Sequence, residues 1–307
     1  RQHGRVGVLG HAGAGAWWRD GGVLMAARNH KHRLSARLWR LCLYVLALLV
    51  AALSLAPLVI AVGTAVKIPG TATSDLSVFP AHPRWANFSD VITGTSLLTY
   101  VKNSIIVTTA TAVISLTCAS MAAYAFSRMR FLLKDVLYVL FLMGLTLPVV
   151  VVLVPLFQTE RLLHLFNTYG ALILPYTGFG MPFAILLLKN YFDSVPREME
   201  EAARIDGASL LRIFVAIVLP LTKPALVTVA IFQSVNSWNE FLLALLFMTQ
   251  DAMRTAPLAI VPFIGQYGDQ TEFMFATLLL ITLPPIALFI IMQRQFVSGL
   301  TAGAIKG

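Results

Sequence analysis

One carboxylate stands inside an otherwise uncharged apolar run. Glu240 is the only charged residue between Pro224 and Gln250. A charge within a hydrophobic span is costly, so it is a functional-site candidate by default. At helical spacing the polar side chains of Gln233, Asn236 and Ser237 share one face with it. We therefore predict that this face lines a solute path and hydrogen-bonds a polar molecule.

The residues next to Glu240 leave other interpretations open. Trp238 and Asn239 precede the carboxylate, and the Trp238 ring would offer a flat surface to a sugar ring. The same polar groups would also suit a hydrogen-bond network that holds membrane helices together. A third hypothesis makes Glu240 the ion site of a transporter driven by an ion gradient.

The residue patterns of common enzymes are missing from the sequence. It contains no phosphate loop, no G-x-G-x-x-G, no H-E-x-x-H, no C-x-x-C and no G-x-S-x-G. The cysteines, Cys42 and Cys118, lie in apolar runs and predict neither a disulfide framework nor a metal site. We expect a chain that is not an enzyme and that binds no cofactor or metal of its own.

A charged, helix-prone stretch forms the second candidate site. Pro196 suits a first helical turn, the acidic residues after it favour the N-terminus of that helix, and Gly207 can take the left-handed conformation that ends it. An apolar segment follows and stops at a Leu-Pro pair. The pattern predicts a helix–Gly–helix finger over residues 196–220, with these candidate residues: Glu198, Glu201, Ala202, Ala203, Asp206, Gly207, Leu219 and Pro220.

The composition indicates that the finger belongs to a membrane protein. The chain has 307 residues, of which 58% are hydrophobic and 12% are charged, against about 25% charged in soluble domains. A membrane-spanning helix needs about 20 apolar residues, and lipid excludes unpaired strands. We predict an all-α membrane protein with six transmembrane helices at residues 41–66, 103–126, 136–159, 165–188, 224–250 and 273–293.

The basic residues predict the orientation, because cytoplasmic loops are enriched in Lys and Arg. With the N-terminus inside, eighteen basic residues fall on the cytoplasmic side and five outside. Residues 1–40 and 294–307 are then cytoplasmic tails, and the finger also faces the cytoplasm. We expect residues 1–24 to be an upstream extension. This topology explains the net charge of +9 without a nucleic-acid partner.

The finger carries a resemblance to a known family. Glu201-Ala202-Ala203, Gly207 and Ile217-x-Leu219-Pro220 resemble the signature loop of permease subunits in bacterial ATP-binding-cassette (ABC) importers. From about Leu41 onward the chain is similar to the smaller, six-span permease subunit of carbohydrate importers of the maltose type. The Gly-rich C-terminal run is similar to the tail of that subunit, with Gly299, Thr301, Gly303 and Lys306 as its candidate interface residues.

The resemblance implies a mechanism and a set of partners. These are a second permease subunit, two ATPase subunits that hold ATP and Mg, an extracytoplasmic solute-binding protein, and a sugar. In such importers of the bacterial plasma membrane, ATP drives alternating access, and the finger sits in a cleft of an ATPase. Glu201 would anchor the finger, and Gly207 would shape its bend. The tail would reach the ATPase interface, and residues 251–272 would touch the binding protein. The open alternatives are an ion-driven secondary transporter and an ABC permease for a non-sugar solute.

Overall fold

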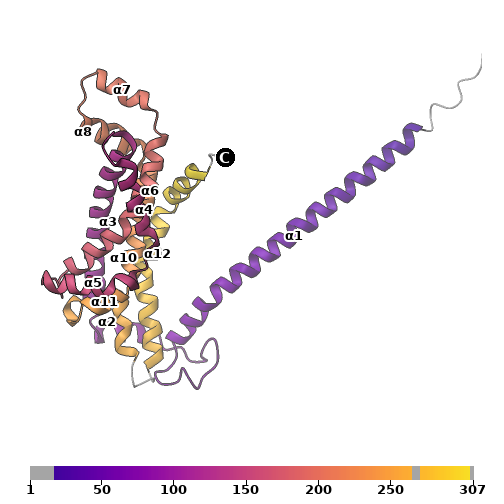
Figure 1. Ribbon diagram of the computed structural model, residues 1–307. Coiled ribbons are helices and arrows are strands. Elements are labelled where there is room, and N and C mark those ends of the chain that lie inside the picture. Colours follow the sequence, from indigo (N-terminus) through magenta and orange to yellow (C-terminus); the bar gives the residue numbers. More distant parts are fainter. Residues whose placement is uncertain (1–16, 265–269, 305–307) are drawn as a thin grey trace, which may run out of the picture. The chain divides into compact units, whose positions relative to one another are not determined.

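The computed structural model describes residues 17–264 and 270–304, with side chains described for residues 39–264 and 270–293. Within these ranges the chain forms helices and no strands (Figure 1). Residues 1–60 and 61–307 are two separate compact units. In chain order the main helices are α1 (Trp17–Ala65), α2 (Ala86–Gly94), α3 (Leu97–Arg128), α4 (Lys134–Met143), α5 (Val149–Leu162), α6 (Gly170–Ser194), α7 (Arg197–Ile205), α8 (Leu210–Ile213), α9 (Leu219–Leu221), α10 (Lys223–Asn239), α11 (Leu242–Phe247) and α12 (Thr271–Ala304).

Shorter helical turns join these elements. η1 (Gly144–Thr146), η3 (Asp251–Met253) and η4 (Ala256–Phe263) are 3₁₀ turns, and η2 (Phe214–Val218) is a π-helical turn between α8 and α9. Pro220 lacks the N–H that a regular helix would use, and it follows this π turn directly. The second arm of the finger therefore continues through the Leu-Pro pair to Leu221 instead of stopping at it.

Four helices are long and apolar enough to cross a membrane. They are residues Trp39–Ala65 of α1, all of α3, all of α6, and residues Thr271–Gln293 of α12. Two bent pairs bring the number to six if each pair counts as one span: Lys134–Thr146 with Val149–Leu162, and Leu210–Leu221 with Lys223–Asn239. The four long helices and the first bent pair overlap the first four predicted segments and the sixth. The second bent pair begins at Leu210, inside the predicted finger, and its α10 covers the predicted span 224–250 only as far as Asn239.

The third predicted span, residues 136–159, bends by 104° between its two halves. The break falls at Leu147-Pro148, where both residues are extended, with ψ of 114° and 133°. Proline disfavours the helical conformation in the residue before it, which explains the position of the break. The fifth predicted span, residues 224–250, also ends its first helix early, because Glu240 is extended with ψ of 124°.

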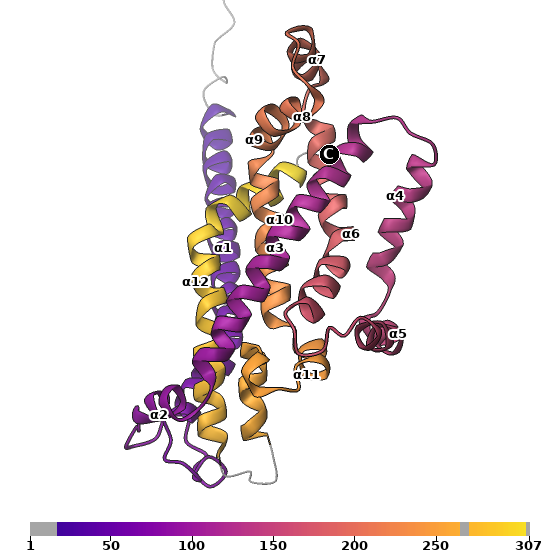
Figure 2. The same ribbon diagram turned by 90° about the vertical axis from the view of Figure 1, so that its left-hand side faces the viewer.

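The core of residues 61–307 is a bundle in which α3 packs on α6 and α10, and α10 packs on α12 (Figure 2). Small residues let α3 and α6 approach closely: Ala119, Ala123 and Ala184 are fully buried in one cluster with Leu188 and Phe192. Close packing of small side chains is the usual basis of helix association in membranes, where the solvent is as apolar as the helices.

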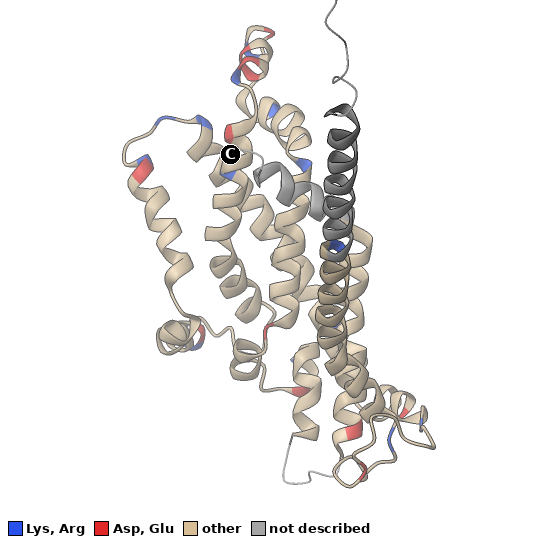
Figure 3. Cartoon of the chain, turned by 90° about the vertical axis from the view of Figure 1, so that its right-hand side faces the viewer, with Lys and Arg blue, Asp and Glu red and all other residues tan. Residues whose placement is uncertain are grey.

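Charged residues lie mainly at the two ends of this bundle (Figure 3). One end carries α7 and α8, and we call it the finger end. The opposite end carries α2, η3 and η4, and we call it the loop end (Figures 1 and 2). The helices between them are almost free of charge, as the hydrocarbon layer of a bilayer requires.

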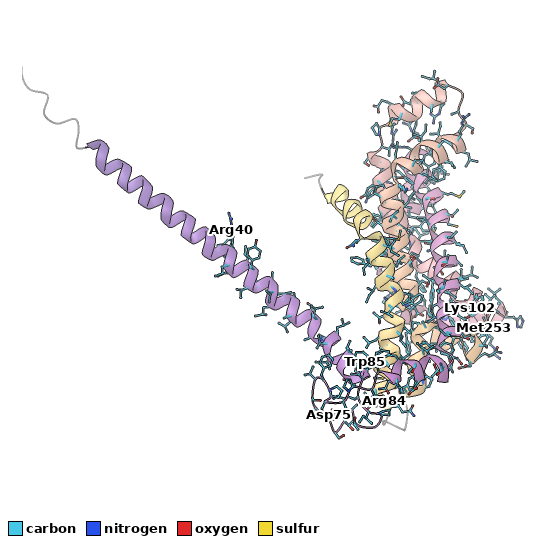
Figure 4. All side chains as sticks on the ribbon, turned by 180° about the vertical axis from the view of Figure 1, so that it is seen from behind. Arg40, Asp75, Arg84, Trp85, Lys102 and Met253 are labelled. Atoms are coloured by element: carbon cyan, nitrogen blue, oxygen red, sulfur yellow. The ribbon has the colours of Figure 1, made fainter. Side chains whose placement is uncertain are left out.

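The loop end is held by buried polar side chains. Asn87 of α2 donates to the carbonyls of Ala65 and Lys67, both at 2.8 Å. Glu272, fully buried at the start of α12, accepts the backbone N–H groups of Thr71 and Ala72 at 2.9 and 2.7 Å. Figure 4 shows this end and labels Arg84 and Trp85, which directly precede α2 in the chain. The long connection between the first two spans is thus held in place by buried hydrogen bonds.

Candidate functional site: a polar cavity and a helical finger

A cavity of about 380 Å³ opens between α6, α10 and the α4–α5 break. All four polar residues that the helical spacing grouped together line it: Gln233, Asn236, Ser237 and Glu240. The rest of its wall is mostly apolar or aromatic, including Tyr176, Phe179, Phe183 and Phe232. We call it the Glu240 cavity. A mostly apolar wall with a few converging polar groups is the usual form of a small-molecule site.

The Glu240 carboxylate is fully engaged at the break that follows α10. It accepts the Tyr176 hydroxyl at 2.6 Å and the backbone N–H groups of Leu243 and Ala244 at 2.9 and 3.2 Å. These two N–H groups begin α11 and would otherwise lack partners. A carboxylate at a helix N-terminus also interacts favourably with the positive end of the helix dipole. Glu240 therefore has a clear structural role as the cap of α11, whatever it does for a solute.

Gln233 fixes the wall of the cavity to α6. Its Nε2 donates to the Tyr176 carbonyl at 2.9 Å, and the side chain lies directly against Gly180. A Cβ added at Gly180 would lie 2.0 Å from Gln233 Oε1, so only glycine permits this approach. Asn236, by contrast, is exposed at the cavity, where its amide is free to meet a solute.

Trp238 and Asn239 do not line this cavity. Trp238 is buried, and its Nε1 donates to the Ile281 carbonyl of α12 at 3.0 Å. Its ring lines a separate cavity of about 190 Å³ beside Pro284 and Pro285. Trp238 therefore anchors α10 to α12, and its ring is not available to a solute beside Glu240, contrary to the hypothesis from sequence.

The finger stands at the end of the bundle with most of its predicted residues exposed. Glu198, Glu201 and Ala202 are exposed on α7, Asp206 is exposed directly after it, and Pro220 is exposed on α9. Ala203 and Leu219 are half-buried and pack against the core. Gly207 has φ of +81°, the left-handed conformation that glycine adopts without strain. The predicted bend is therefore present at the predicted residue.

Sequence reasoning missed the residue that holds the finger to the bundle. Glu200 is buried, and its carboxylate pairs with Arg128 Nε at 2.6 Å and accepts the Tyr124 hydroxyl at 3.1 Å. Arg128 also donates to the Val195 carbonyl at 2.7 Å, just before α7. We call these four residues the Arg128 cluster. Glu200 and Ala203, three positions apart, share one face of α7. That spacing, together with an arginine at the end of a span, could have identified Glu200 from the sequence as the residue that faces the bundle.

Within this chain, Glu200 anchors the finger to the bundle, next to the residue Glu201 for which an anchoring role was predicted. Glu201 is exposed on α7 and stays a prediction as a contact for another subunit. Gly299, Thr301 and Gly303 fall in the last part of α12, whose side chains lie outside the described residues, and Lys306 lies outside them altogether. The predicted interface of the tail also stays a prediction.

These features define a class of protein: a multi-pass helical membrane protein with a polar cavity in its bundle and an exposed finger at one end. In the described part of the chain no group of three or more His, Cys, Asp or Glu side chains could hold a metal ion. Residues 115–302 match the family described as "Binding-protein-dependent transport system inner membrane component". The chain belongs to this family of ABC importer permeases, which confirms the resemblance of the finger.

Individual relatives extend the match beyond the family region. The chain is 40% identical over 228 residues to a putative ABC transporter permease of Caldicellulosiruptor sp., covering 74% of this chain and 82% of that protein. It is 37% identical over 241 residues to the trehalose transport system permease protein SugB of Mycobacterium tuberculosis, covering 78% and 88%. It is 37% identical over 229 residues to the sulfoquinovosyl glycerol transport system permease protein SmoH of Agrobacterium fabrum, covering 75% and 80%.

A solved structure confirms the fold. The chain superposes with a TM-score of 0.72 and 22% identity on a chain of a bacterial ABC transporter involved in the import of the acidic polysaccharide alginate, covering 85% of this chain and 98% of that one. The predicted fold, an all-helical permease of the ABC importer type, is therefore correct.

Proposed function

We propose that this chain is one permease subunit of an importer that moves a sugar or sugar derivative into the cytoplasm. The main support is that relatives at 37% identity are named for the transport of trehalose, a disaccharide, and of sulfoquinovosyl glycerol, a sugar derivative. The Glu240 cavity, with its aromatic wall and its free Asn236 amide, suits a polar, ring-shaped solute.

The proposal includes the partners that the resemblance implies. A second permease subunit completes the membrane path, two ATPase subunits hold ATP and Mg, and an extracytoplasmic binding protein delivers the solute. This chain is then a transport subunit without catalysis of its own and with no cofactor. The excess of Lys and Arg on the finger side supports cytoplasmic termini and a cytoplasmic finger, with the loop end outside.

The finger is the proposed site of energy coupling. Its exposed residues, Glu198, Glu201, Ala202 and Asp206, offer a docking surface of carboxylates and small side chains. ATP-driven closure of the ATPase subunits would move this surface, and the bundle would alternate between outward-open and inward-open states. Anchoring of Glu200 in the bundle supports this role, because a finger that transmits force must be fixed at its base.

The contacts of Glu240 weigh against the ion-driven alternative. Three hydrogen-bond donors already occupy its carboxylate, which favours a structural cap over a site that binds and releases ions. The family match to binding-protein-dependent systems weighs in the same direction. An ABC permease for a non-sugar solute remains the second candidate.

The test is uptake by the complete transporter, co-expressed with ATPase, permease and binding-protein partners from the same organism and reconstituted in liposomes. We expect ATP-dependent uptake of labelled trehalose or another glycoside that is unaffected by an uncoupler. Glu201→Lys should abolish this uptake while the permease pair still assembles. Uptake that an uncoupler stops, or that an inactive ATPase leaves unchanged, would refute the proposal. Transport of amino acids or phosphate in place of sugars would favour the second candidate.

A further inference from the structure

α3 differs from the other spans in composition. Among the spans of the described residues, α3 alone contains neither proline nor glycine. Its 32 residues extend over roughly 48 Å at about 1.5 Å per residue. It is therefore a rod that runs from the finger end of the bundle to the loop end (Figures 1 and 2). Kinks in helices arise at proline, glycine or inserted groups, and α3 lacks the first two.

The finger end of this rod is joined to the finger by buried charges. Arg128, the last residue of α3, pairs with Glu200 of α7, and both side chains are less than a tenth exposed, at 8% and 6%. The same guanidinium donates a hydrogen bond to the Val195 carbonyl, so it binds both the finger and the segment that leads into it. Because an unpaired charge is costly inside a protein, this pair resists separation when the finger moves.

The opposite end of the rod is joined to the segment that follows α11. Asn103 Nδ2 donates to the carbonyls of Ala252 and Arg254 at 2.9 and 2.8 Å. The Ser104 hydroxyl accepts the N–H of Ala256 at 2.8 Å, and Tyr100 donates to Asp251. Figure 4 labels Lys102 of α3 and Met253 of η3 at this end of the bundle, where the two elements are in contact. The turns η3 and η4 are thus tied to α3 over about one helical turn.

The route through the chain itself is more pliable. The finger continues N-terminally into α6, which contains Pro175 and Pro182 as well as glycines at 170, 178 and 180. Towards its C-terminal side the finger meets the bent connection of 79° before α10. Motion of the finger would be absorbed at these positions, whereas α3 has none of them.

We propose that α3 carries movement of the finger to the outer segment 251–263, with the Arg128–Glu200 ion pair as one joint and Asn103 as the other. Arg128, Glu200 and Asn103 are positioning residues in this scheme, since they act through the helix and not on the solute. The inference rests on the proposed function, because it needs an ATPase that moves the finger.

The experiment uses the complete transporter with its partner subunits. Cys42 and Cys118 are replaced by Ser, and a bimane fluorophore is attached at Ile264→Cys, which is 58% exposed just after η4. Trapping with ATP and vanadate should shift the emission of this probe. ATP hydrolysis by the same preparation reports whether the ATPase subunits remain engaged.

We expect Arg128→Gln to reduce the emission shift at least threefold while ATP hydrolysis continues. The charge swap Arg128→Glu with Glu200→Arg should restore most of it. Asn103→Leu should also abolish the shift, because it breaks the outer joint. The matched control is Lys189→Gln, which removes the neighbouring Lys189–Asp193 ion pair on the surface of α6 and should leave the shift unchanged.

A full emission shift in assembled Arg128→Gln transporter overturns the inference and leaves the proposed function standing. Absence of ATP hydrolysis in the labelled transporter with Arg128 and Glu200 intact overturns both, whereas ATP hydrolysis without any emission shift in that transporter overturns the inference alone. If Arg128→Gln does not assemble, Glu200→Gln provides the same measurement, because it removes the charge while keeping the shape of the side chain. A full shift with that variant likewise refutes the role of the ion pair.

Discussion

Glu240 and Tyr176 join two helices across the wall of the cavity: the α6 hydroxyl donates to the carboxylate at 2.6 Å, at the residue where α10 ends. The same carboxylate begins α11. One side chain therefore sets the position of three helices around the cavity. A change at this residue should affect the shape of the cavity before it affects assembly of the bundle.

We predict that Glu240→Ala lowers uptake at least tenfold while the transporter still assembles. The substitution leaves the Tyr176 hydroxyl and two N–H groups without their acceptor, at a cost of about 1–3 kcal/mol for each group that stays buried. Glu240→Gln keeps one acceptor oxygen and should lose less. Solute uptake and size-exclusion chromatography of the complex check this. Normal uptake by assembled Glu240→Ala would show that the carboxylate is dispensable.

Gly180→Ala should lower solute affinity several-fold, because its methyl group would displace the Gln233 amide from the Tyr176 carbonyl. Gly178→Ala is the matched control on the same helix, since nothing lies within 4 Å of a Cβ there. That control should be neutral or stabilising by about 0.5–1 kcal/mol. Solute uptake by the two variants is the measurement. Equal uptake would mean that the close approach of Gln233 to Gly180 has no functional consequence.

Gly207→Val should uncouple ATP hydrolysis from uptake. The φ of +81° at this position costs a residue with a Cβ about 1–2 kcal/mol, and β-branched residues tolerate it least. Gly207→Asn should behave almost normally, since asparagine adopts this conformation more readily. The ratio of solute transported to ATP hydrolysed is the measurement. A normal ratio in Gly207→Val would mean that the bend at this residue is not needed.

Asp251 gives a pH dependence at the loop end. Hydrogen bonds from Tyr100 and then Ser96 hold the pKa of Asp251 below its usual value near 3.8. Because the pKa of Asp251 is lower in the folded than in the unfolded chain, its ionised carboxylate stabilises the fold fully at any pH above the unfolded-state pKa. This stabilisation is lost as the pH falls through the folded-state pKa. Because the side chain is 61% exposed, the effect is small, about 1 kcal/mol at most.

Hydrogen exchange of residues 251–256 should therefore be constant between pH 5 and 7, after correction for intrinsic rates, and should increase only below about pH 4. Asp251→Asn should remove that increase. A loosening of this segment near pH 6 would point to a different titrating group.

Much of the architecture could be predicted because its causes are local. A run of apolar residues about 20 long has one stable form in lipid, so the rough position of the long apolar helices followed from composition. Gly207 could be predicted as the bend because only its own backbone conformation was at issue. The grouping of Gln233, Asn236, Ser237 and Glu240 followed from the period of the helix.

The breaks in the third and fifth spans were harder to predict. Proline is common within membrane helices, and Pro175 and Pro182 lie inside an unbroken α6, whereas Pro148 stands in the break, directly before α5. Whether proline bends or breaks a span depends on which neighbouring groups satisfy the freed carbonyls. That information lies in other helices.

The sequence by itself determined that this chain spans a membrane, that a charged finger interrupts its spans, and that one polar face lies in the fifth. Each depends on residues within a few turns of one another. Only the tertiary structure decided that Glu200, not Glu201, is buried against Arg128, and that Trp238 faces α12 instead of the cavity. These choices depend on contacts between residues 43 to 72 positions apart, and helical periodicity does not reach across such distances.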